Sequence, residues 1–128
     1  MTHPGETDSV PGMGSPDCLF CKIVAKQIPA KIAHEDDRTL AFHDINPQAP
    51  THVLVIPKQH IATLNDVTEA DRELVGHVAM VGAQIAKQLG HDGPGWRALW
   101  NVNADAGQTV FHIHMHVLGG RRFGWPPG

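Results

Sequence analysis

Hydrophobic residues and histidines alternate strictly from Phe111 to Val117, where the chain reads Phe-His-Ile-His-Met-His-Val. Alternation with a period of two predicts a half-buried β-strand, because successive side chains of a strand point to opposite faces. One face of this strand would carry the apolar residues Phe111, Ile113, Met115 and Val117. The other face would carry the imidazoles of His112, His114 and His116, about 6.6 Å apart along the strand. Three groups that titrate near neutral pH therefore share one surface.

The same pattern predicts further strands over residues 31–35, 39–44, 52–56 and 96–102. The run at 52–56 is the most apolar of these and is predicted to be central in the sheet, with Pro57 closing it. The connections between the first three strands are too short for crossover helices. We therefore expect an antiparallel meander.

Two helices are predicted. A short one covers residues 18–26 with Asp17 as its N-cap, and Phe20 and Ile23 lie on its apolar side. A long one begins at Thr68, which together with Asp71 resembles a capping box, and ends before Gly90. The sum is an α+β domain with helices on one face of the sheet and histidines on the other.

The long helix has two stripes of small or apolar residues. The first follows the spacing of a core-facing helix and contains Leu74, Val78, Val81, Ile85 and Leu89. The second contains Val75, Ala79, Gly82 and Ala86. Two interpretations of the second stripe stay open: contact with a partner subunit, or a helix that lies deep in its own core.

The composition excludes several classes of protein. The chain has 128 residues, enough for one domain, and a net charge of −3 without the basic stripe that binds nucleic acid. Its longest apolar run is far too short to span a membrane, and its beginning does not resemble a signal peptide. Two cysteines do not make a secreted disulfide framework. We therefore expect a cytoplasmic protein that binds neither nucleic acid nor membrane, with a disordered tail over residues 1–16 and one domain over residues 17–128.

Three imidazoles on one face suit metal binding, acid–base or nucleophilic catalysis, or a solvated structural surface. His52 would lie beside them if the central strand pairs with theirs. Gly107, Gln108 and Thr109 supply backbone N–H groups and a hydroxyl, which suit an anionic phosphoryl centre. No carboxylate falls inside the strand, as a carboxylate-rich metal site would require. Covalent phosphoryl chemistry with a neutral imidazole as nucleophile is therefore favoured.

Residues 112–118 resemble the signature of the histidine-triad (HIT) family, in which apolar residues separate three histidines. Residues 42–45, 47–52, 55–58, 106–108 and 119–121 and the terminal Trp-Pro-Pro-Gly resemble its Hint-like branch. The resemblance extends from Cys18 to Gly128. It implies a HIT-like α+β fold: an antiparallel sheet of about five strands with one long and one short helix. It also implies a homodimer formed through the long helix and the strand near Trp100.

The resemblance implies an activity as well. Hint-like proteins hydrolyse the P–N bond of purine nucleoside phosphoramidates to release an amine and a nucleoside monophosphate, AMP or GMP. By motif position, His114 would be the nucleophile that forms a nucleotidyl-histidine intermediate. His116 would contact the phosphoryl oxygens and assist protonation of the leaving group, while His112 and His52 would orient His114. No cofactor is implied for this catalysis.

The nucleotide site follows from the same motifs. Asp44 would hold the ribose hydroxyls beside His43, and Trp125 would approach the partner subunit's active site. The base would be enclosed by Ile45, Phe42, Phe20 and Ile23, and the phosphate by Asn101, Gly107, Gln108 and Thr109. Without the resemblance, Phe42, Phe20 and Ile23 are more typical of a core than of a base pocket, and Asp44 is equally typical of a turn. Thr109 stands where the family usually has Ser, and Phe111 where Tyr is common.

Cys18 and Cys21 form a C-x-x-C pair without the βαβ setting of a thioredoxin-like redox site. Some bacterial HIT proteins join such a pair to two histidines around zinc, and the matching positions here are His60 and His112. A site with two cysteines and two histidines is a complete tetrahedral structural site. The alternative is two reduced thiols without metal.

Two other functions stay open at this stage. One is a dinucleoside polyphosphate hydrolase of the same family, against which the Trp-Pro-Pro-Gly ending argues. The other is a zinc-holding interaction module whose nucleotide pocket is vestigial.

Overall fold

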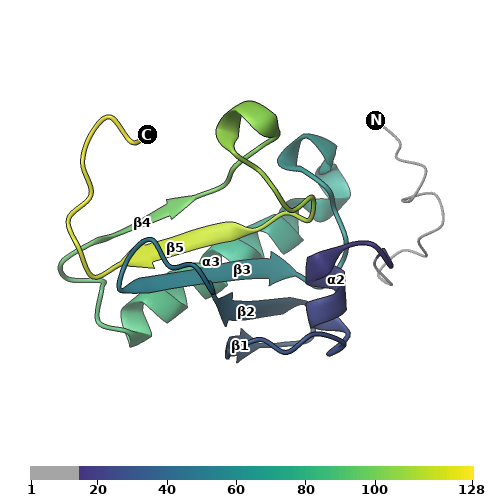
Figure 1. Ribbon diagram of the computed structural model, residues 1–128, viewed down its shortest axis with the longest axis horizontal. Coiled ribbons are helices and arrows are strands. Elements are labelled where there is room, and N and C mark those ends of the chain that lie inside the picture. The colour runs from purple at the N-terminus through teal and green to yellow at the C-terminus, as the bar shows by residue number, and fades with distance from the viewer. Residues whose placement is uncertain (1–14) are drawn as a thin grey trace.

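The computed structural model describes residues 15–128, so most of the tail expected over residues 1–16 lies outside the described residues. The chain forms a five-stranded antiparallel sheet with the long helix α3 behind it and the short helix α2 in front, at one end (Figure 1). The strands are β1 (Ile32–Glu35), β2 (Thr39–His43), β3 (Thr51–Pro57), β4 (Trp96–Leu99) and β5 (Met115–Gly119). The helices are α2 (Leu19–Val24) and α3 (Arg72–Gln88), with single 3-10 turns at Leu64–Asp66, Glu69–Asp71 and Ala104–Ala106. The predicted α+β architecture is confirmed.

The strand order across the sheet is β1-β2-β3-β5-β4. The first three strands form the expected meander, and β3 is central as predicted. The meander does not continue, because α3 carries the chain away from the sheet after β3. The chain then forms β4 at the sheet edge, and β5 lies between β3 and β4. Among residues 15–128, no helix has the length and apolar content needed to cross a membrane.

The face behind the sheet packs against α3. Its core contains Ala41, Val53, Val55, Met115 and Val117 from the strands and Val78, Val81, Ile85 and Ala86 from the helix. Gly82 faces the sheet where α3 crosses β5, and a Cβ at that position would meet the side chains of Met115 and Val117. Gly82 and Ala86 of the small-residue stripe are therefore buried in the protein's own core, while Ala79 is exposed.

The front face carries the second core, and here one expectation is wrong. We expected both helices on the face opposite the histidines, but α2 packs on the histidine face, against Leu40, Phe42, Leu54 and Ile56. The predicted N-cap is wrong as well. Cys18, not Asp17, caps α2, and its sulfur accepts a hydrogen bond from the Cys21 backbone N–H at 3.2 Å.

The alternating stretch is a strand only in its second half. Strand β5 begins at Met115, and residues 111–114 approach it as irregular chain. Phe111 is 42 % exposed and does not face the core as predicted. Ile113 is buried as predicted, and its backbone N–H donates to Ile61 O at 2.8 Å. The pattern identified the correct buried side from Ile113 onward but placed the start of the strand too early.

Candidate active site and metal centre

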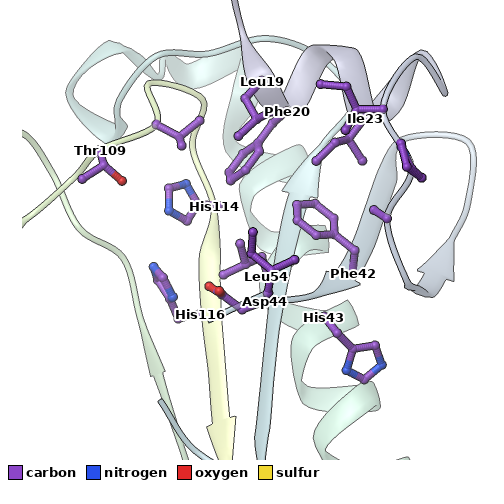
Figure 2. Close-up of a pocket in the computed structure, with 15 residues that line it drawn as sticks. Leu19, Phe20, Ile23, Phe42, His43, Asp44, Leu54, Thr109, His114 and His116 are labelled. Atoms are coloured by element: carbon purple, nitrogen blue, oxygen red, sulfur yellow. The ribbon is translucent and has the colours of Figure 1, made fainter. Parts of the chain in front are cut away.

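A cavity of about 390 Å³ opens on the histidine face between α2, the end of β2 and the start of β5. It brings together nine of the predicted site residues: Phe20, Ile23, Phe42, His43, Asp44, Ile45, Thr109, His114 and His116. Figure 2 shows the rings of His114 and His116 on one side of the cavity, with Phe20 and Phe42 across from them. The cavity thus joins an apolar wall to two imidazoles and a carboxylate.

One ring nitrogen of His114 points toward the backbone carbonyl of His112. Its Nδ1 lies 2.8 Å from the carbonyl oxygen of His112. Because a carbonyl only accepts, Nδ1 carries the proton and Nε2 keeps a free lone pair. Burial, the largest influence, lowers the pKa of His114, so the ring is neutral at pH 7. A buried neutral imidazole with a fixed tautomer is a competent nucleophile.

A chain of hydrogen bonds fixes the opposite tautomer at His116. The Gln48 backbone N–H donates to His52 Nδ1 at 3.0 Å, so the proton of His52 lies on Nε2. His52 Nε2 lies 2.8 Å from His116 Nδ1 and donates to it, which leaves the proton of His116 on Nε2. That Nε2 is buried and has no hydrogen-bond partner among the described residues. His116 is therefore a hydrogen-bond donor that lacks an acceptor.

Burial also keeps this pair neutral. Burial, together with the neighbouring His114 and His52 rings, lowers the pKa of His116 to about 4. Burial likewise lowers the pKa of His52, although the Asp44 carboxylate, whose Oδ2 lies 3.5 Å from His52 Nε2, opposes this shift. The Asp44 carboxylate accepts the Asn46 backbone N–H at 2.8 Å and lines the cavity with its remaining surface.

The structure does not bring every predicted residue into the cavity. Gln108 is buried in the loop instead: its amide donates to Ala62 O and Val110 O, and its carbonyl accepts from the Asn103 N–H. Gly107 ends a 3-10 turn with a φ of 85° in the same loop. Neither Asn101 nor Trp125 lines the cavity, and Trp125 is 84 % exposed. Their roles at the phosphate or at a partner's site stay predictions.

Several lining residues were missed by the sequence analysis: Leu19, Ile28, Pro29, Ala30, Leu54 and Val110. Leu54 had a usable signal, because it lies two residues after His52 on the same strand and so shares its face. Residues 28–30 had no usable sequence signal, because their place beside the cavity depends on how the chain returns from α2 into β1.

A second polar group lies beside the cavity, at the start of α2. The ligand atoms of Cys18, Cys21, His60 and His112 all lie within 4.8 Å of one another. The two sulfurs are each 3.4 Å from His112 Nδ1, Cys21 Sγ is 3.3 Å from His60 Nδ1, and the two Nδ1 atoms are 3.3 Å apart. Zinc bonds of about 2.3 Å to sulfur and 2.0 Å to nitrogen imply separations of about 3.5 Å and 3.3 Å in a tetrahedron. The four residues, which we call the Cys/His cluster, therefore fit a tetrahedral zinc ion.

His112 belongs to this cluster and not to the cavity. Its ring is fully buried, and its Nε2 lies 2.7 Å from the carbonyl oxygen of Pro57. Nε2 therefore carries the proton, and the lone pair of Nδ1 points at the two cysteine sulfurs. A histidine that binds zinc through one nitrogen commonly donates its other N–H to a carbonyl in this way. His112 thus touches His114 only through its own backbone carbonyl.

The two thiols are not equivalent. A hydrogen bond from Cys18 lowers the pKa of Cys21 to about 7, against the effect of burial and with the help of the Ser15 backbone N–H. The shared hydrogen bond with Cys21 and burial raise the pKa of Cys18. Both cysteines are free of disulfides. Two cysteine sulfurs, one with a lowered pKa, and two imidazole nitrogens form a donor set that favours zinc.

Comparison with known proteins identifies the family of this chain. Residues 25–123 match the family model described as HIT domain. The chain is 46 % identical to the purine nucleoside phosphoramidase of Escherichia coli K12 over 108 residues, which cover 84 % of this chain and 91 % of that protein. An uncharacterized HIT-like protein of Synechocystis is 50 % identical over 112 residues, covering 88 % and 97 % of the two chains.

Solved structures give the same result. The HIT family hydrolase of Legionella pneumophila has a TM-score of 0.86 and 52 % identity, covering 88 % of this chain and all of that one. A histidine triad protein of Clostridium difficile has a TM-score of 0.85 and 44 % identity, covering 88 % and 97 %. The chain belongs to the HIT domain family.

Proposed function

We propose that this protein hydrolyses the P–N bond of purine nucleoside phosphoramidates through a covalent nucleotidyl-histidine intermediate. The observation that carries the proposal is the pair of opposed tautomers at the cavity. His114 presents a lone pair on Nε2, and His116 presents a buried N–H without an acceptor. A nucleophile and a donor on one side of a cavity are what transfer of a phosphoryl centre requires. The similarity to the E. coli purine nucleoside phosphoramidase supports the choice of substrate.

The reaction has two steps in this proposal. His114 Nε2 attacks phosphorus, the P–N bond breaks, and the amine leaves with one proton that is taken up from solution by way of His116. A water then attacks phosphorus, the bond to His114 breaks, and one proton of that water returns to solution by the same route. The His116 N–H also stabilises negative charge on the phosphoryl oxygens in both steps.

The wall of the cavity suits a nucleoside. Phe20, Phe42 and Leu54 form an apolar surface on which a purine would be desolvated. The Asp44 carboxylate at the same cavity would accept hydrogen bonds from ribose hydroxyls. The Thr109 hydroxyl lies at the cavity near His114, where it would donate to the phosphate (Figure 2).

Zinc in the Cys/His cluster is a second part of the proposal. Cys18, Cys21, His60 and His112 would hold it, and with four protein ligands it would have no open position for catalysis. Zinc would act structurally, by tying the start of α2 to the loop after β3 and to the residues before β5. The expected cytoplasmic location belongs to the same proposal, because zinc thiolates require reduced cysteines.

A homodimer is the third part. Strand β4 lies at the edge of the sheet, and Ala79 and Met80 expose the outer side of α3, with Met80 72 % exposed. An unpaired strand edge and an exposed apolar side chain are typical of an interface. In such a dimer, Trp125 would reach the partner's cavity.

Incubation with adenosine 5′-phosphoramidate tests the activity. We expect release of AMP by the native protein and none by His114→Ala. The rate on a diadenosine polyphosphate, measured in parallel, should be much lower. Intact phosphoramidate after hours with the native protein would rule the proposed activity out.

A further inference from the structure

Helix α2 connects the Cys/His cluster to the cavity. It has six residues, and the segment from its N-cap onward contributes side chains to both sites. Cys18 is its N-cap and Cys21 lies in its first turn, while Phe20 and Ile23 line the cavity. A helix this short is not stable by itself and depends on its tertiary contacts. The position of Phe20 therefore depends on what holds the two cysteines.

Phe20 in turn lies against the nucleophile. Its ring meets the ring of His114 edge to face, with centroids 5.1 Å apart, and meets Phe42 in the same way at 5.3 Å. Such contacts are directional and lose energy when one ring shifts. Displacing α2 would thus change both the apolar wall and the support of His114.

A second connection runs through His112. Its side chain belongs to the cluster, and its backbone carbonyl accepts the His114 Nδ1–H that fixes the tautomer of the nucleophile. The cluster therefore reaches the cavity by two routes, one through α2 and one through His112.

We propose that metal binding at the Cys/His cluster and nucleotide binding at the cavity are thermodynamically coupled, so that each raises the affinity for the other. This inference rests on the proposed function, because it takes a nucleotide as the ligand of the cavity. Without a metal, the two sulfurs and the two imidazole nitrogens are joined by contacts of 3.3–3.4 Å. Such hydrogen bonds anchor the start of α2 less firmly than four bonds to one zinc ion would. A nucleotide that binds only the ordered wall must then order it first, and its apparent affinity falls. Reciprocity follows from linkage.

His60 gives the cleanest test of this coupling. It is a cluster residue that follows β3, and it lies outside α2, the cavity lining and the three histidines of the motif. It would be a positioning residue that acts on the cavity through the cluster. His34 is a suitable control, because its ring bonds Asp36 directly after β1 and it belongs neither to the cavity lining nor to the cluster.

The experiment measures the same coupling from both sides. Calorimetry gives the Kd for AMP of the zinc-loaded protein, of the chelated protein and of His60→Ala. Cobalt titration, followed by the thiolate-to-cobalt absorption band, gives the metal affinity with and without saturating AMP. We expect the loss of metal to weaken AMP binding by about 5- to 150-fold, and AMP to strengthen cobalt binding by the same factor. His34→Ala should show the wild-type coupling.

The outcomes separate the two proposals. If the zinc-loaded protein does not bind AMP, both the proposed function and the coupling are wrong. If AMP binds equally tightly with and without metal, the coupling alone is wrong, whatever the rate of hydrolysis. Far-UV circular dichroism at the temperature of the titrations must match between chelated and loaded protein. If chelation abolishes that signal, metal binding controls the whole fold and not the cavity alone, which overturns a coupling carried by α2 and His112.

Discussion

His112 and His116 belong to one motif and lie four residues apart, yet their rings have opposite surroundings. Both nitrogens of His112 face partners within the protein, Pro57 O on one side and the cysteine sulfurs on the other. His116 accepts one hydrogen bond from His52 and keeps a buried N–H that no described residue accepts. A buried polar group without a partner costs stability. Its presence at a cavity indicates that a ligand supplies the missing acceptor.

Within the motif, His112 lies in a different environment from His114 and His116. His112 belongs to the Cys/His cluster, and its backbone carbonyl accepts the His114 Nδ1–H. His114 and His116 face the cavity with opposite tautomers. Identical side chains at regular spacing therefore have three different environments, which are set by their hydrogen-bond partners.

The largest expected effect is that of replacing the unsatisfied donor. His116→Gln should lower kcat for adenosine 5′-phosphoramidate by about 10²- to 10⁴-fold, the usual contribution of a positioned proton donor. The matched control is His77→Gln, whose histidine bonds Asp36 and lies on α3, away from the cavity. Wild-type turnover in His116→Gln would contradict the proposed role of His116 as the proton donor at the cavity.

Zinc bound at the Cys/His cluster, which includes His112 of the motif, should stabilise the folded protein. Zinc at about 1,000 times its Kd adds about 4 kcal/mol to the free energy of unfolding if it binds only the native state. Denaturant unfolding with zinc and with chelator measures this difference. Cys21→Ser should lose the zinc-dependent part. An identical midpoint for wild-type protein in zinc and in chelator would contradict the fit of the cluster to a metal.

The smallest effect is the pH dependence of stability. Burial depresses the pKa of His116 from 6.5 to about 4, so between these values the unfolded chain binds a proton that the native ring does not. This contribution to stability is therefore complete above pH 6.5 and decreases as the pH falls toward 4, by about 1.4 kcal/mol per pH unit for this one group. Unfolding free energies measured from pH 7 to 4 should show the decrease. His116→Gln should show a shallower slope, and an equal slope would contradict the neutral buried ring.

Local patterns in the sequence predicted most of the fold. The apolar run of β3, the stripe of α3 and the positive-φ glycine at Gly90 were each recognisable from neighbouring residues. The irregular stretch around Phe111 was not recognisable in this way. There the Ile113 backbone N–H bonds Ile61 O in the loop after β3, a contact between residues distant in the sequence. The side of the sheet that α2 covers was also not predictable, since it depends on contacts of Cys18 and Cys21 with residues about 90 positions away.

The site was predictable to a similar extent. The motifs indicated His114, His116, His52 and Asp44, and the structure brings these four together. Gln108 was expected at the phosphate, but its amide is used by the Ala62 and Val110 carbonyls, partners that the sequence could not identify. The division of His112 from the cavity likewise depends on Pro57, 55 residues earlier.

The most direct test of the central proposal is the intact mass of the protein after it is mixed with adenosine 5′-phosphoramidate and rapidly quenched. The proposed mechanism predicts an added mass of one adenylyl unit, located on His114 and absent in His114→Ala. His34→Ala, with its histidine outside both sites, should form the adduct normally. Turnover without any adduct on the time scale of the reaction, or an adduct that persists in His114→Ala, would contradict the assignment of His114 as the nucleophile.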